Sequence, residues 1–174
     1  MKLTNKQIKQ IINEELRNVL IEADAYSCNR HSLGFIDEKG KYIDIDKIPW
    51  TTTHSGYMEG YLEKQGFDFS GMTDQEKYEA TNITPKGWIK ISRADEISYE
   101  GESWKKAKEK GLIDGLIEMW MACSKYSPWL KNKALVKPVI FRSNSGEETL
   151  TIDKFLDAYG TPEQFDKLFN YLMK

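Results

Sequence analysis

The sequence predicts an α+β fold in which short antiparallel β-hairpins pack with helices, after an N-terminal amphipathic helix. Three pairs of strand-like segments are joined by turn residues, which favours antiparallel pairing within each pair. Segments with helical spacing of their apolar residues alternate with these pairs. The N-terminal segment shows the same helical spacing. We therefore expect an N-terminal helix over residues 1–24 and a single α+β domain over residues 25–174.

The composition is that of a folded chain without a membrane span. Hydrophobic residues make up 40% of the 174 positions and aromatic residues 12%, enough to build a core. No apolar run approaches the roughly 18 residues that a membrane-spanning helix needs, so no membrane partner is expected. The net charge of −2, from 25 basic and 27 acidic residues, disfavours nucleic-acid binding driven by overall charge.

The first segment has the pattern of an amphipathic helix with a defined start. Thr4 is a suitable N-cap, and Gln7 follows three residues later, as in a capping box. The segment lacks the continuous apolar run of a secretory signal. Such a helix can pack on its own domain or present its stripe to a groove of a protein partner. The stripe consists of Ile8, Ile11, Ile12, Leu16, Val19 and Leu20.

This segment resembles the N-terminal leaders of small internal proteins of tailed bacteriophages. The resemblance lies in residues 1–4, 14–16 and 19–23. In T-even-type phages, similar leaders direct proteins into the prohead, where a protease cuts after an apolar-x-Glu triplet. Leu20-Ile21-Glu22 fits that triplet and implies cleavage between Glu22 and Ala23. The resemblance implies a capsid or scaffold partner, and a location in the virion or the host cytoplasm.

Local signals divide the rest of the chain into hairpins and helices. Hairpins are expected from residues 33–37 with 41–45, 88–91 with 96–99, and 135–141 with 149–152. Helices are expected at residues 54–65 after Thr53, 74–81 after Thr73, 104–125 after Ser103, 154–159 after Asp153 and 162–172 after Thr161. In the last helix the predicted buried face is Phe165, Leu168, Phe169 and Leu172.

Cysteine and histidine provide the first candidate chemistry. Cys28 lies in a polar segment, where an imidazole from His31 or His54 could generate a nucleophilic thiolate. Cys28 and His31 also have a spacing seen in metal sites. A closed zinc site needs four ligands, and the chain contains no CxxC or HxxxH motif to complete one. No metal or cofactor is therefore predicted.

A second candidate site combines an aromatic wall with hydroxyl groups. Trp50 precedes three threonines and His54 at a predicted helix start, where free N–H groups can receive an anion. The alternative is that Thr53 only caps the helix, Trp50 packs against its start and His54 is a surface residue. Residues 34–37, 53–54, 87–91 and 100–101 resemble small phage and bacterial proteins of no assigned activity. The candidate catalytic residues are His54, Thr53, Cys28 and Arg93, and the candidate ligand-binding residues are Trp50 and Trp88.

A basic stretch offers a third possibility. It has no acidic residue within it and has Trp129 and Phe141 nearby, a combination that could contact phosphates and stack on bases. A solvated strand edge protected by lysine has the same pattern. The basic residues are Lys131, Lys133, Lys137 and Arg142.

These observations leave three functional hypotheses. The favoured one is a phage virion-associated or capsid-packaged accessory protein docked by its N-terminal helix. The second is a small hydrolase or transferase that uses His54 with Cys28 or Arg93. The third is a weak nucleic-acid-binding module built on the basic stretch.

Overall fold

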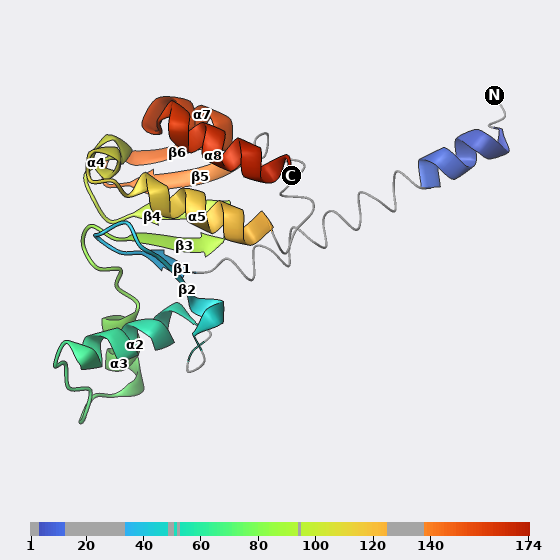
Figure 1. The fold of residues 1–174 in the computed structure, drawn as a ribbon. Helices are drawn as coiled ribbons and strands as arrows, with labels where there is room; N and C mark the ends of the chain where they lie inside the picture. The colour runs from blue at the N-terminus through green and yellow to red at the C-terminus, as the bar shows by residue number, and fades with distance from the viewer. Residues whose placement is uncertain (1–3, 13–33, 49–50, 52, 94, 125–137) are drawn as a thin grey trace.

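The computed structural model describes residues 4–12, 34–48, 51, 53–93, 95–124 and 138–174. Within these residues, helices and a six-stranded sheet form an α+β fold, which confirms the predicted class (Figure 1). A helix also covers residues 5–12. No helix in the described part of the chain is long and apolar enough to cross a membrane. The elements are β1 (Gly34–Ile36), β2 (Tyr42–Asp44), the 3-10 helix η1 (Ile45–Lys47), α2 (His54–Lys64), α3 (Asp74–Thr81), β3 (Ile89–Arg93), β4 (Glu96–Tyr99), α4 (Trp104–Glu109), α5 (Ile113–Ser124), β5 (Pro138–Ser143), β6 (Gly146–Thr151), α7 (Ile152–Tyr159) and α8 (Pro162–Leu172).

The sheet is mixed, with strand order β2-β1-β3-β4-β5-β6. The three predicted hairpins are present as the antiparallel pairs β1–β2, β3–β4 and β5–β6. Strand β1 also pairs antiparallel with β3. The pair β4–β5 is parallel, a pairing between hairpins that the sequence did not predict. A parallel pair needs a long crossover, and the chain between these strands contains α4 and α5.

The main core lies between one face of the sheet and helices α4, α5, α7 and α8 (Figure 1). Its centre is aromatic. The rings of Phe141 and Phe155 stack with centroids 3.9 Å apart, and the Trp104 ring meets both edge-on at 5.5 and 5.2 Å. All three side chains are at most 2% exposed, so the sheet and the C-terminal helices share one desolvated core.

A smaller second core lies between the opposite face of the sheet and α2. It consists of Phe35, Ile45, Met58 and Trp88, each at most 4% exposed. Strand side chains point alternately to the two faces of a sheet. In β1, therefore, Ile36 enters the main core while Phe35 enters the second core.

Local capping signals located most helix starts correctly. The Thr53 hydroxyl accepts from the Gly56 N–H, and the Ser103 hydroxyl accepts from the Lys106 N–H. Helices α3 and α8 begin with complete capping boxes at Thr73 and Thr161. These bonds satisfy backbone donors that a helix leaves unpaired in its first turn.

Three local expectations were wrong. The long helix expected to reach residue 125 is split into α4 and α5, because the chain between them passes through Gly111 with φ +76°. The N-cap of α7 is Thr151, and Asp153 lies inside the first turn of that helix. Phe169, expected to be buried, is 38% exposed, whereas Leu168 and Leu172 of the same helix are buried.

The close approach of α5 to the first hairpin depends on a glycine. A Cβ atom at Gly115 would lie 2.6 Å from Cγ2 of Ile36 and 2.8 Å from the carbonyl oxygen of Gly40. Neither neighbour is the end of a flexible chain, because Gly40 contributes backbone and Ile36 is fully buried. A side chain here must push the helix away from the hairpin.

We expect Gly115→Ala to lower the free energy of unfolding by about 1–3 kcal/mol through overpacking. Helix propensity alone predicts the opposite sign, a gain of about 1 kcal/mol. Urea unfolding followed by circular dichroism measures the difference. Glu118→Ala, at an exposed position of the same helix, is the control and should change stability little. A more stable Gly115→Ala protein would contradict the packing described here.

Candidate functional site

His54 is the first residue of α2, and its ring reaches the backbone of two strands. Nε2 lies 2.9 Å from the carbonyl oxygen of Ile91 and 3.2 Å from that of Gly34. Carbonyl oxygens only accept hydrogen bonds, so Nε2 carries the proton and donates it. The ring thus ties the start of α2 to paired residues of β1 and β3. In the neutral ring, Nδ1 is the nitrogen that remains available as a base.

The surroundings of His54 favour its neutral form. The edge of the ring meets Phe35, with centroids 5.0 Å apart at 87°. Burial lowers the pKa of His54, and the positive charge of Lys90 lowers it further, while the hydrogen bonds to Ile91 and Gly34 oppose both effects. The outcome is an uncharged imidazole that joins a helix to the sheet.

Thr53 and Trp88 are also engaged in holding this region together. The Thr53 hydroxyl lies 3.0 Å from the Gly56 nitrogen, from which it accepts the capping bond. Trp88 is 4% exposed, and its Nε1 donates to the Glu38 carboxylate. The Trp88 ring meets Phe35 edge-on at 5.8 Å. The structure therefore brings His54 and Trp88 to the same aromatic neighbour, inside the second core.

Arg93 extends from the end of β3 and is exposed. Its Nη2 lies 3.0 Å from a carboxylate oxygen of Glu96, and its Nε lies 3.6 Å from Asp95. Its charge is therefore shared with two acidic neighbours. Two further predicted site residues, Cys28 and Trp50, lie outside the described residues, as does His31.

Arg142 is the described member of the predicted basic stretch. Nη1 lies 2.8 Å from Glu96 and Nε lies 2.8 Å from Glu147, so two carboxylates occupy its guanidinium. The bond from Arg142 holds the pKa of Glu96 below its usual value. These two carboxylates offset the positive charge that Arg142 would offer a phosphate. Lys131, Lys133 and Lys137 lie outside the described residues.

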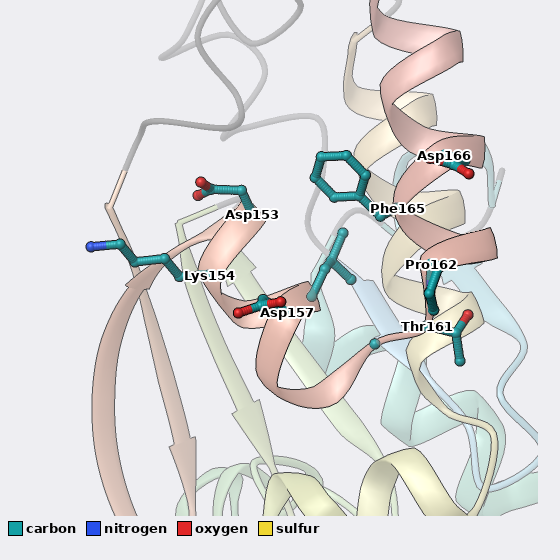
Figure 2. A pocket seen from close by; sticks show the side chains of 9 residues that line it. Asp153, Lys154, Asp157, Thr161, Pro162, Phe165 and Asp166 are labelled. Atoms are coloured by element: carbon teal, nitrogen blue, oxygen red, sulfur yellow. The ribbon is translucent and has the colours of Figure 1, made fainter.

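A hollow of about 490 Å³ lies between α7 and α8, and sequence reasoning did not predict it (Figure 2). Leu156 and Phe165 give it apolar walls, and Gly160, Thr161 and Pro162, where α7 ends and α8 begins, also line it. Its charged lining residues are Asp153, Asp157, Asp166 and Lys154. One signal was available in the sequence. Asp153 and Asp157 are four residues apart, which places both carboxylates on one side of α7.

A second hollow, of about 580 Å³, lies beside β2, α5 and α2. Its charges nearly cancel, because three acidic and two basic residues line it, and Asp44 pairs with Lys47 at 3.7 Å. Within the described residues, no group of three or more His, Cys, Asp or Glu side chains could hold a metal ion. The charged lining residues are Asp37, Asp44, Glu118, Lys41 and Lys47.

The N-terminal helix exposes its apolar residues. Ile8, Ile11 and Ile12 are 42%, 47% and 51% exposed, and all of residues 4–12 are exposed. The expected capping box is formed, with 2.9 Å from the Thr4 nitrogen to Gln7 Oε1 and 3.2 Å from the Gln7 nitrogen to Thr4 Oγ1. We call Ile8, Ile11 and Ile12 the isoleucine ridge. The other predicted partner-binding and cleavage residues, Leu16, Val19, Leu20, Glu22 and Ala23, lie outside the described residues.

Comparison with known proteins adds no relative. No family model matches the chain, and neither the curated proteins nor the solved structures searched gave a match.

The His54 geometry predicts a pH-dependent contribution to stability. A folded pKa below 6.5 means that the unfolded chain binds the proton more readily. His54 therefore favours folding least at acidic pH, and the protein gains stability as pH rises toward and through 6.5. His54→Gln should abolish this part of the gain and, at pH 8, cost about 1–2 kcal/mol for the lost bonds to backbone carbonyls. Urea unfolding of both proteins across this pH range measures it. An equal pH dependence in both would contradict the burial of His54.

Proposed function

We propose that the protein is a docking accessory protein that binds a larger assembly through its N-terminal helix. The observation that supports this best is the isoleucine ridge, whose three large apolar side chains are each more than two-fifths exposed. In keeping with the leader resemblance, we propose that the assembly is the capsid or scaffold of a tailed phage. The protein would then be found in the virion or in the host cytoplasm.

The spacing of the ridge suits a helix that binds in a groove. Residues at positions i, i+3 and i+4 lie on one side of a helix and enter a partner groove together. Complete burial of an isoleucine side chain is worth about 1.5–3 kcal/mol, so the remaining exposure of three of them provides a few kcal/mol. Association consumes part of this energy. The sequence continues the stripe with Leu16, Val19 and Leu20, which would lengthen the contact.

The alternative hypothesis of a hydrolase or transferase gains less support from the described geometry. His54 is the residue on which that hypothesis depends, and its Nε2 is bonded to two backbone carbonyls. Arg93 is shared between two acids. Both residues are thus engaged with other groups of the protein, whereas the isoleucine ridge contacts none in the described part of the molecule that would bury it.

We expect Ile8→Asp combined with Ile12→Asp to reduce binding to T-even-type proheads at least tenfold, because two charges replace two buried contacts. Cosedimentation of purified protein with proheads measures this. Ile83→Asp is the matched control. It replaces an isoleucine that is 66% exposed outside the N-terminal helix, so it should leave binding unchanged. Wild-type binding that survives the ridge substitutions would refute the proposed docking.

Cleavage provides a separate prediction. In maturing particles the protease is expected to produce a new N-terminus at Ala23, and Glu22→Gln should block it because the triplet requires the carboxylate. Glu14→Gln alters another triplet of the same kind, Ile12-Asn13-Glu14, and is the control. Mass spectrometry of protein recovered from particles identifies the terminus. A protein that keeps Met1 in mature particles would refute the proposed cleavage but not the proposed docking.

A further inference from the structure

The hollow between α7 and α8 continues into an exposed apolar strip on α8. Phe165 lines the hollow, and its ring lies nearly parallel to that of Phe169, with centroids 5.9 Å apart. Phe169 is 38% exposed, and Met173, just beyond the helix, is 70% exposed. These three side chains are spaced four residues apart and therefore follow one side of α8. Together with Leu156 they form an apolar floor, which we call the α7–α8 groove.

The rim of the α7–α8 groove is acidic. Asp153, Asp157 and Asp166 line the hollow against a single base, Lys154. Asp153 and Asp157 lie on α7, on the opposite side of the hollow from Phe165 of α8 (Figure 2). The groove thus combines an apolar floor with acidic residues from both α7 and α8, which favours an apolar helix that carries basic residues.

The N-terminal helix of this chain has the complementary pattern. The first acidic residue of the sequence is Glu14, so residues 4–12 carry only the positive charges of Lys6 and Lys9. At about 100° per residue, Lys9 lies beside the isoleucine ridge, about 60° around the helix from Ile12, whereas Lys6 lies on the opposite face. The helix is therefore positively charged and carries one lysine next to its apolar ridge. This charge complements the acidic lining of the groove.

We infer that the α7–α8 groove binds the N-terminal helix of a second copy of this chain, and that two copies exchange their helices reciprocally. This inference rests on the proposed role of the helix as a docking element. The structure favours a second copy because the helix stands apart from α7 and α8 of its own chain, with every residue from 4 to 12 exposed (Figure 1). Reciprocal exchange uses the same contact twice, so a closed two-fold dimer gains from both.

Such a dimer would cover the ridge until the assembly partner replaces it. An exposed apolar patch promotes non-specific association, and the exchanged helices remove two such patches from water. The ridge cannot occupy the groove and a prohead site at once. Dimerisation and prohead binding therefore compete, and a weak dimer would suffice.

The test is the molar mass of the full chain, measured by size-exclusion chromatography with light scattering from low to high micromolar concentration. The wild-type protein should shift from the 20.2 kDa monomer to twice that mass.

Lys9→Asp and Asp157→Lys should each weaken the dimer at least tenfold, and the protein carrying both should regain it, because the pair is restored with reversed charges. Lys105→Asp, at an exposed lysine of α4, is the control and should behave as wild type. Circular dichroism verifies that each variant is folded, and Phe169→Ser supplies an uncharged disruption of the same groove.

Several outcomes would overturn the inference. A monomer at every concentration would do so, which includes the case of a helix docked within its own chain. Open oligomers that grow beyond the dimer would exclude reciprocal exchange, and a double variant that fails to recover would exclude this pairing. The proposed function fails separately. If prohead binding depends on Ile8 and Ile12 while the protein stays monomeric, only the dimer is refuted. If the dimer forms but the ridge substitutions leave prohead binding intact, only the prohead role is refuted.

Discussion

Strand β1 contributes a buried side chain to each of the two hydrophobic cores, so the packing of both depends on its three residues. Ile36 faces the helices of the main core, and Phe35 faces α2 in the second core. The strand pairs on both sides, with β2 and with β3. Gly34 allows this crowding, since a Cβ atom there would lie 2.2 Å from the carbonyl oxygen of Ile43. The position of α2, and with it His54, follows from this short strand.

The helix starts were predictable because their signals are local. A Thr or Ser hydroxyl that caps a helix bonds to a backbone nitrogen three residues away, so the sequence contains both partners in one short window. The hairpins were predictable for the same reason. The parallel pairing of β4 with β5 was not, because it brings together strands separated by two helices. Gly111 was visible in the sequence, but the sequence did not show that it adopts the left-handed conformation that separates α4 from α5.

The contacts of the candidate site residues could not be predicted from local sequence patterns. The sequence placed His54 at a helix start, and the structure confirms that position. The ring nitrogen meets carbonyl oxygens 20 and 37 residues away in the chain, and no local pattern encodes these contacts. The same limit applies to Arg142, whose carboxylate partner Glu96 lies 46 residues earlier. In the sequence, both residues were candidates for binding or catalysis, because the groups that bond to them lie far away in the chain.

The charge distribution links the N-terminal helix to the α7–α8 groove. Although the net charge is only −2, the charges are unevenly distributed. The N-terminal helix is basic, and the groove formed near the C-terminus is acidic. Neither surface is long enough to bind tightly alone, since a helix of about ten residues buries only a few large side chains. A weak contact is what a displaceable cover requires, because a partner must release the ridge by mass action. Under these two proposals, cleavage after Glu22 would prevent the dimer from forming again, since the body would keep the groove and lose the helix proposed to bind it.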